Sequence, residues 1–193
     1  PALAPLQLGV GVNGGSQIVS HAINAALAAD PDCVAVKMDY QNAFNSLSRT
    51  AMLEAVAKRQ PTLLPFATWA YRQPSRLIVS GAPEGTPPIM SECGVRQGDP
   101  CGVLYFSLTT RDQLEQMRLT HPNAAPVAYT DDTFLLGKAA AVTAAFPALR
   151  ELGSAIGLDV RPDKCGVCSP NAQAAADTAA AIAKQEALVN SRF

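Results

Sequence analysis

Residues 127–137, VAYTDDTFLLG, hold two short apolar runs on either side of the adjacent aspartates Asp131 and Asp132. Runs of this length and composition, separated by a tight polar turn, predict a β-hairpin, and a hairpin requires an antiparallel sheet. A turn that needed only solubility would use Asn-Gly or Asp-Gly, because neighbouring carboxylates repel each other. The segment therefore predicts both an antiparallel sheet and a point of concentrated negative charge.

The rest of the chain predicts helices packed on that sheet. Asp99 and Pro100 are typical of a helix N-cap and first helical residue, and they precede a long, mostly apolar helix. The predicted helices cover 14–29, 49–59, 63–73, 99–119, 140–157 with a proline break, and 171–193, and the predicted strands cover 33–38, two short stretches within 75–95, the hairpin 126–137, and 164–168. This order predicts an α+β fold with helices backing an antiparallel sheet.

Composition narrows the class of protein. The chain has 193 residues, is 48% hydrophobic and 16% charged, and so predicts one folded domain. Its net charge of −1 gives no electrostatic indication of nucleic-acid binding. The stretch before Asp30 lacks the basic start of a signal peptide and is too interrupted to span a membrane, so we expect no membrane association. The chain begins with Pro1, and we expect it to be part of a longer protein.

Five cysteines without a secretory signal predict reduced thiols in an intracellular protein. Cys165 and Cys168 have the spacing of half a zinc site, but the other half would require a second Cys/His pair. The two histidines, His21 and His121, are isolated, and the sequence therefore favours two ordinary thiols.

Asp39 adds a third carboxylate to the argument, because it directly follows the predicted strand 33–38. If that strand neighbours the hairpin, Asp39, Asp131 and Asp132 converge, which is unfavourable unless divalent cations neutralise them. Magnesium prefers such oxygen ligands, and two ions can clamp the attacking and leaving oxygens of a phosphoryl transfer. The plainer interpretation is that the aspartate pair serves the turn and Asp39 caps a helix.

Four ordered motifs strengthen the first interpretation: VKMDYQNAFNSLSR (36–49), GVRQGDPCGVLYFSL (94–108), AYTDD (128–132) and GLDVRPDKC (157–165). Together they resemble the reverse transcriptase domain, most closely that of LINE-type non-LTR retrotransposons, over residues 7–168. The resemblance implies the palm of a right-hand polymerase with part of the fingers. Residues 1–193 would then be a partial domain, with the N-terminal fingers and the C-terminal thumb outside it.

The resemblance also implies roles for the acidic residues. Asp39 would bind both metal ions, and the main-chain carbonyl of Tyr40 would add a ligand. Asp131 would be the second main ligand, near the primer 3′ oxygen, and Asp132 would have a weaker or indirect role. Thr130 stands where related sequences often carry a smaller residue, at a variable position of the motif.

Five further residues match positions that contact substrates in the family. Phe44 would block a ribose 2′-hydroxyl, although it could equally be a core aromatic. Gln97 and Gly98 would pack against the nucleotide and template base, and Tyr129 would touch the primer end unless it faces the core. Lys164 would protonate the departing pyrophosphate, or would simply be a solvated lysine.

The resemblance implies an RNA-directed DNA polymerase that uses two Mg²⁺ ions, with Mn²⁺ as a substitute. Its partners would be an RNA template, a DNA primer, dNTPs and the remaining domains of a polyprotein, in a retroelement ribonucleoprotein in the nucleus or cytoplasm. A group II intron-like or bacterial reverse transcriptase is an alternative. A viral RNA polymerase is disfavoured by Phe44, and a domesticated, non-catalytic palm that binds nucleic acid stays open.

Overall fold

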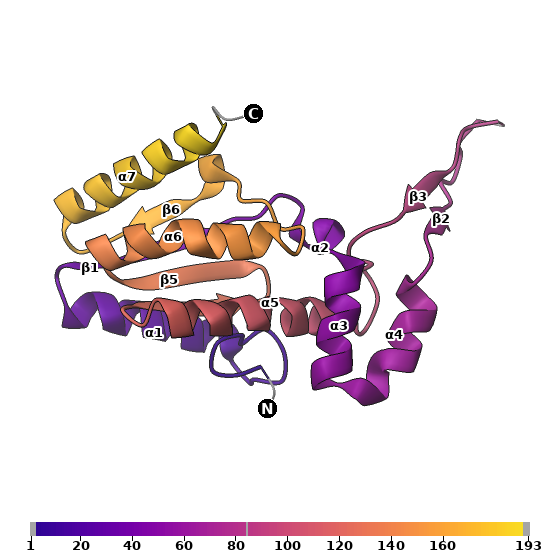
Figure 1. Ribbon diagram of the computed structural model, residues 1–193, viewed down its shortest axis with the longest axis horizontal. Coiled ribbons are helices and arrows are strands. Elements are labelled where there is room, and N and C mark those ends of the chain that lie inside the picture. Colours follow the sequence, from indigo (N-terminus) through magenta and orange to yellow (C-terminus); the bar gives the residue numbers. More distant parts are fainter. Residues whose placement is uncertain (1–2, 84, 191–193) are drawn as a thin grey trace.

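The computed structural model describes residues 3–83 and 85–190, and its centre is a four-stranded antiparallel sheet (Figure 1). The strand order is β4-β5-β1-β6, where β4 is Ala124–Tyr129, β5 is Asp132–Lys138, β1 is Cys33–Met38 and β6 is Gly166–Cys168. The hairpin β4–β5 and the strand β1 confirm the predicted elements, and the helices packed on the sheet confirm the α+β class.

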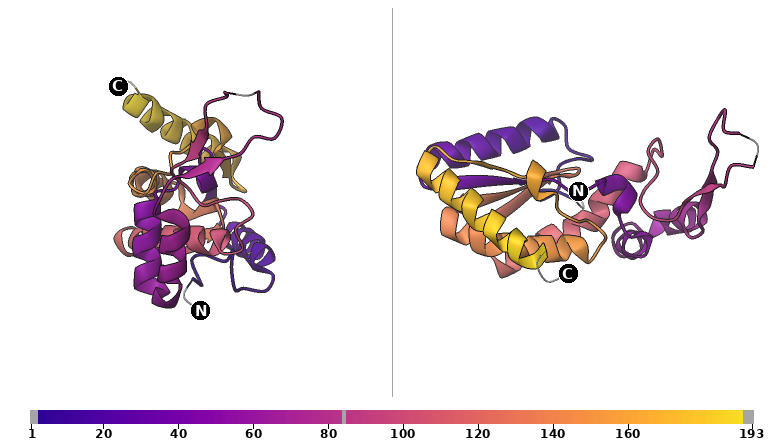
Figure 2. Two further views of the ribbon diagram at one scale, coloured as in Figure 1. Left: turned by 90° about the vertical axis from the view of Figure 1, so that its right-hand side faces the viewer. Right: turned by 90° about the horizontal axis from the view of Figure 1, so that it is seen from above.

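Helices cover both faces of this sheet (Figure 2). One face carries α1 (Gly15–Ala29), and the other carries α5 (Gly102–Thr120), α6 (Ala139–Ser154) and α7 (Ala172–Asn190). The strand β1 is buried from both sides: Val34, Val36 and Met38 pack toward α5, α6 and α7, and Ala35 packs toward α1. This alternation follows the two-residue period of a strand, so Lys37 shares the α1 side with Ala35.

A second group of helices packs against one end of α5 and encloses its own apolar core. It consists of α2 (Ala43–Ser46), α3 (Arg49–Arg59), the 3-10 turn η1 (Pro61–Leu63) and α4 (Leu64–Tyr71). A two-stranded hairpin, β2 (Ser75–Leu77) with β3 (Ile89–Ser91), projects beyond α4 (Figure 1). The long helix α5 therefore joins the sheet to this helical group.

The predicted start of α5 at Asp99–Pro100 is two residues too early, because the helix begins at Gly102. The chain makes a turn at 98–101 instead, in which the Asp99 carboxylate accepts a hydrogen bond of 2.8 Å from the Cys101 amide. Asp99 thus bonds a main-chain amide just before the helix, as its residue type favours, two residues before the cap position at Cys101.

The predicted proline break near Pro147 is also wrong, since α6 runs unbroken through it. Proline has no amide hydrogen and leaves the carbonyl four residues earlier without its helical donor. That carbonyl belongs to Thr143, and the side chain of Gln185 on α7 donates to it at 3.3 Å. A contact with α7 therefore supplies the hydrogen bond that Pro147 cannot donate.

None of the helices in the described part of the chain is long and apolar enough to cross a bilayer. All five cysteines are free thiols. The Cys165 thiol donates to the carbonyl of Arg161 at 3.4 Å, and burial raises its pKa. Cys168 is exposed at the end of β6.

Candidate active site

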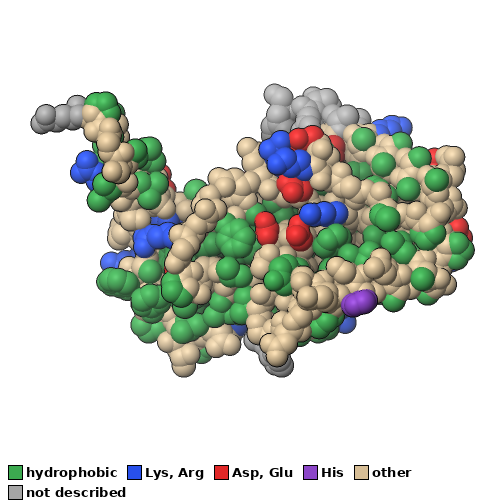
Figure 3. Space-filling model, turned by 180° about the vertical axis from the view of Figure 1, so that it is seen from behind, with side chains coloured by type: hydrophobic (Ala, Val, Ile, Leu, Met, Phe, Trp, Pro, Cys, Tyr) green, Lys and Arg blue, Asp and Glu red, His purple; other side chains and the backbone are tan. Residues whose placement is uncertain are grey.

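The three aspartates lie together at one end of the central sheet. The last residue pair of β1 and β5 is Met38 with Thr133, so Asp39 and Asp132 each lie one residue beyond it, on adjacent strands. Asp131 occupies the turn between β4 and β5. The acidic side chains gather near the middle of the face seen in Figure 3, with Lys and Arg side chains beside them. Residues that are 92 positions apart in sequence thus become neighbours through antiparallel pairing.

Lys37 lies close to these carboxylates, although the resemblance to the family implied no role for it. Its ammonium forms a 2.6 Å ion pair with Asp132. This hydrogen bond raises the pKa of Lys37; partial burial opposes it, and the charges of Asp132, Asp39 and Asp131 raise it further. Lys37 precedes Asp39 by two residues and so shares its side of the strand, which is the signal that could have identified it.

The Asp39 and Asp131 carboxylates are available for a ligand. Asp39 is half-buried, and no hydrogen bond or ion pair of its carboxylate occurs in residues 3–83 and 85–190; Asp131 is exposed and accepts only from the Thr130 hydroxyl, at 2.9 Å. No group of three or more His, Cys, Asp or Glu side chains in the described residues is arranged to hold a metal ion. Asp132 is turned to Lys37 instead, and the two remaining carboxylates offer the hard oxygen donors that Mg²⁺ prefers.

Tyr40 directly follows Asp39 at the end of β1. It pairs with Val160, in the segment before β6. The bridge between Tyr40 and Val160 uses the Gln41 amide and the Asp39 carbonyl, which accepts from the Arg161 amide at 2.8 Å. The carbonyl of Tyr40 is not used in this bridge. Burial raises the pKa of the Tyr40 phenol to about 12, against the opposing effect of its bond to Thr133, so its ring is a packed, neutral group.

Arg161 is a second cation near the site that the sequence did not reveal. Its amide holds the main chain of Asp39, and its guanidinium pairs with Asp163 at 2.7 Å. The bond to Asp163 raises the pKa of Arg161, and the charge of Asp39 adds to this effect. Lys164 lies three residues further, exposed in the 3-10 turn η2 (Pro162–Lys164). The structure brings the main chain of Arg161, just before this turn, to Asp39, and within residues 3–83 and 85–190 the Lys164 ammonium has no hydrogen bond or ion pair.

Phe44 lies in α2 and packs against the apolar core of the second helical group. Its ring stacks on Phe106 of α5, with centroids 4.5 Å apart and planes at 20°. Its carbonyl accepts from the Val95 amide at 2.7 Å. Gly94 permits this approach: its φ is +71°, and a Cβ there would lie 2.3 Å from the Cα of Asn45. Phe44 is therefore partly core, as one interpretation held, and is also joined to the segment that leads to Gln97.

Gln97 and Gly98 are exposed in the loop before α5, and Gly98 has a φ of +93° with open space around it. The loop contacts Tyr71, and the guanidinium groups of Arg49 and Arg96 lie 5.3 and 5.1 Å from the centroid of its ring. The Tyr71 hydroxyl donates to Asp99 and accepts from the Arg96 amide. Cation–π contacts and hydrogen bonds with Tyr71 thus fix the position of the loop.

Removal of the Tyr71 hydroxyl by Tyr71→Phe is expected to lower the free energy of unfolding by about 1.5–3 kcal/mol, because a hydrogen bond to a charged group is lost. Tyr105→Phe is the matched control: Tyr105 is fully buried beside Tyr71, and within the described residues its hydroxyl has no partner. This control should be neutral or slightly stabilising. Urea unfolding of both variants checks the expectation, and equal effects would contradict it.

Tyr129 ends β4 on the side of α1, half-buried against the small core that α1 forms with the sheet. A Cβ at Gly15 would lie 3.3 Å from its ring. Tyr129 therefore combines core packing with proximity to Asp131.

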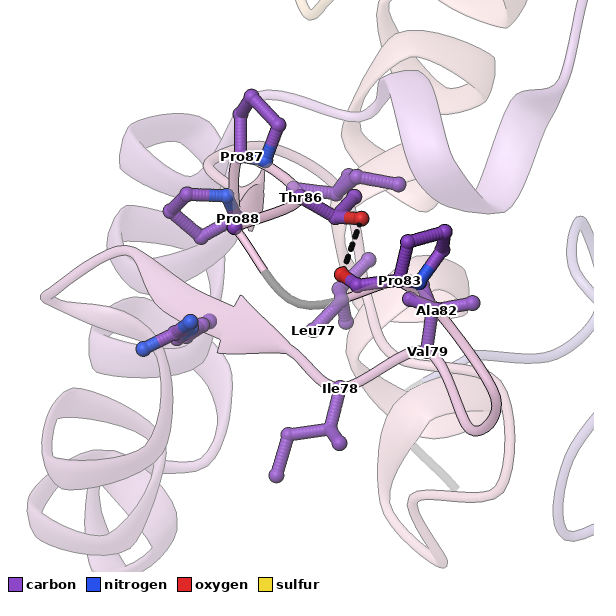
Figure 4. Close-up of a pocket in the computed structure, with 11 residues that line it drawn as sticks. Leu77, Ile78, Val79, Ala82, Pro83, Thr86, Pro87 and Pro88 are labelled. Atoms are coloured by element: carbon purple, nitrogen blue, oxygen red, sulfur yellow. Dashed lines mark hydrogen bonds between the residues drawn. The ribbon is translucent and has the colours of Figure 1, made fainter.

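A separate hollow of about 410 Å³ lies on the projecting β2–β3 hairpin, away from the aspartates (Figure 4). Its lining includes Leu77, Ile78 and Val79, which are largely exposed, and Ile78 is 92% exposed. The Thr86 hydroxyl donates to the Pro83 carbonyl at 2.6 Å across the loop. The hollow contains none of the predicted site residues.

Comparison with solved structures shows the fold. The chain matches telomerase from Candida albicans in complex with a fragment of telomeric RNA, with a TM-score of 0.54 and 10% identity over 80% of this chain and 30% of that one. It matches apo telomerase from Candida tropicalis with a TM-score of 0.61 and 10% identity over 82% and 33%. The α+β fold predicted for a right-hand polymerase palm is confirmed.

Sequence comparison shows the family. A curated relative, the retrotransposable element SLACS 132 kDa protein of Trypanosoma brucei gambiense, is 31% identical over 139 residues, which is 67% of this chain and 11% of the relative. The chain thus spans about a tenth of that protein. The model of the family described as reverse transcriptase (RNA-dependent DNA polymerase) matches residues 10–186. This chain belongs to the reverse transcriptase family.

Proposed function

We propose that this chain is the catalytic palm, with part of the fingers, of a retrotransposon RNA-directed DNA polymerase of the LINE type. The observation that carries the proposal is the meeting of Asp39, Asp131 and Asp132 at one sheet end, where two carboxylates are free to bind a cation. The retrotransposon relative supports the source. The rest of the fingers and the thumb would belong to other parts of a longer protein.

Asp39, Asp131 and the Tyr40 carbonyl would hold two Mg²⁺ ions, or Mn²⁺ as a substitute. When bound, these ions would supply Lewis-acid activation of the primer 3′-hydroxyl and charge neutralisation of the pyrophosphate that leaves. Asp132 would act indirectly, because its ion pair with Lys37 occupies one of its oxygens. Lys37 would thereby limit the repulsion among the carboxylates.

The other residues would position the substrates. Phe44 would exclude the 2′-hydroxyl of a ribonucleotide, and the Gln97–Gly98 segment would let the backbone approach the nucleotide and template base closely. Tyr129 would contact the primer end. Lys164 would donate a proton to the pyrophosphate oxygen as the α-phosphate is transferred. The template would be recognised by its shape and backbone, not its sequence.

The test is extension of a DNA primer on an RNA template by a protein that contains the whole chain and its natural flanks. We expect incorporation of dNTPs that requires Mg²⁺ or Mn²⁺ and stops with EDTA. A properly folded protein that shows no metal-dependent incorporation on RNA would contradict the proposal. A DNA template of the same sequence is the control for template preference.

One observation favours a second candidate, a non-catalytic palm that binds nucleic acid. Lys37 already neutralises part of the acidic cluster without a metal. Thermal unfolding with added Mn²⁺ separates the two candidates, because a ligand that binds only the folded state raises the melting temperature. A catalytic cluster should gain stability from Mn²⁺ that a non-catalytic palm lacks.

A further inference from the structure

The N-terminal segment 6–9 lies along the outer edge of β4, which is the edge strand of the sheet. The Ala128 amide donates to the Leu6 carbonyl at 2.7 Å, and the Leu8 amide donates to the Ala128 carbonyl at 2.8 Å. Gln7 forms the parallel bridge to Ala128 between these two bonds. This segment therefore reaches the hairpin turn that carries Asp131.

The side chain of Gln7 is fully buried, and its amide makes every hydrogen bond that it can. Its oxygen accepts from the amides of Thr130 at 2.8 Å and Gly9 at 3.1 Å. Its nitrogen donates to the carbonyl of Thr130 at 2.9 Å and to the hydroxyl of Thr110 at 3.2 Å. A buried network with all its partners satisfied is rigid.

Two of these bonds hold both main-chain polar groups of Thr130, the residue directly before Asp131. Thr130 has a φ of +55°, and the left-handed region is unfavourable for a β-branched residue. Gly9 makes room for the turn, because a Cβ there would lie 2.6 Å from the Thr130 methyl group. The buried side chain of Gln7 thus holds the strained turn, and we call its four hydrogen bonds the Gln7 clamp. The conformation of the turn determines the direction in which the Asp131 side chain points.

The same side chain connects the turn to α5. Thr110 lies on this helix, one turn after Phe106, and its hydroxyl donates to the Phe106 carbonyl at 3.2 Å. Phe106 in turn carries the ring of Phe44. Gln7 therefore links the turn before Asp131 to α5, the helix on which Phe44 packs. Phe44 is the residue proposed to exclude a ribose 2′-hydroxyl.

We propose that Gln7 is a positioning residue for polymerisation, which holds the Thr130 turn so that Asp131 points into the acidic site. The proposal rests on the proposed function. It assigns a role in catalysis to a buried amide outside the four motifs, 123 residues from the threonine that it holds.

The test uses Gln7→Met, which preserves size and removes all four hydrogen bonds, in a protein that contains the whole chain. Gln116→Met is the matched control, because Gln116 is exposed on α5. We expect the kcat of primer extension to fall about 10- to 100-fold, as for other residues that orient a metal ligand. The KM for dNTP should stay within a factor of about three, since Gln7 does not touch the nucleotide. The Mn²⁺ concentration for half-maximal rate should rise.

Gln7→Asn supplies a second variant, because it keeps a neutral amide but is one methylene shorter, so it cannot keep all four hydrogen bonds. It should lie between wild type and Gln7→Met in kcat, and it decides the matter if Gln7→Met does not fold. A kcat within twofold of the Gln116→Met control would overturn the proposal. So would a loss of activity that only follows the folded fraction, since Gln7 would then be structural.

Hydrogen exchange provides a readout that does not depend on polymerase activity. In Gln7→Met, the Thr130 amide should exchange at least about tenfold faster, while amides of β1 stay protected. An unchanged exchange rate of the Thr130 amide would contradict the proposal that Gln7 holds the turn. A wild-type protein without any extension activity, but with a protected Thr130 amide, would defeat the proposed function and leave the clamp intact.

Discussion

Asp39→Asn is expected to lower the kcat of RNA-templated primer extension by about 10³-fold or more, in a protein that contains the whole chain. The amide keeps the size of the side chain but removes the charge that would bind a divalent ion. A bound ion contributes several kcal/mol of charge stabilisation to a phosphoryl transfer, and each 1.36 kcal/mol corresponds to about tenfold in rate. Steady-state extension with dNTPs and Mg²⁺ measures the loss.

The three aspartates should differ in a graded way. Asp131→Asn should match Asp39→Asn, whereas Asp132→Asn should cost about tenfold in rate, because Asp132 is paired with Lys37 and not free. Asp177→Asn on the exposed surface of α7 is the control and should leave the rate unchanged.

Folding should survive Asp39→Asn and Asp131→Asn, because each removes a negative charge from a cluster of like charges. Mn²⁺ should raise the melting temperature of wild type and of Asp177→Asn but not of Asp39→Asn. Extension at the wild-type rate by Asp39→Asn or Asp131→Asn would refute the assignment of metal ligands.

Phe44→Val is the second large expected effect: the preference for dNTPs over rNTPs should fall about 10- to 100-fold. The ring of Phe44 is held by stacking on Phe106 and by the main-chain bond to Val95. It would present a fixed wall that a ribose 2′-hydroxyl could not pass, and valine would open space for that oxygen. The ratio of kcat/KM for matched dNTP and rNTP on one RNA template checks this.

Phe44 also packs against the core of the helical group, so its truncation must be separated from a loss of stability. Phe146→Val is the matched control: Phe146 is fully buried in the core between the sheet and α6. This control should destabilise the protein and leave nucleotide selection unchanged. An equal fall in selection for both variants would show that stability, and not a steric wall, governs the ratio.

Much of the fold follows from short stretches of sequence. The apolar runs on either side of Asp131 and Asp132 formed the predicted hairpin, and the run before Asp39 formed β1. These elements were predictable because strand propensity and turn chemistry act within a few residues. The local rules were less exact for the helices: the turn at Asp99 delayed the start of α5, and at Pro147 a contact from the distant Gln185 replaced the missing helical bond.

The local sequence by itself determined which residues end strands and turns: the carboxylates of Asp39, Asp131 and Asp132 sit where apolar runs stop. Only the tertiary structure decided that β1 pairs beside β5 in the register that joins them, and that Lys37 and Gln7 reach the same site. Strand register and buried hydrogen bonds depend on the packing of the whole core. No stretch of sequence short enough to be interpreted alone contains both partners of such contacts.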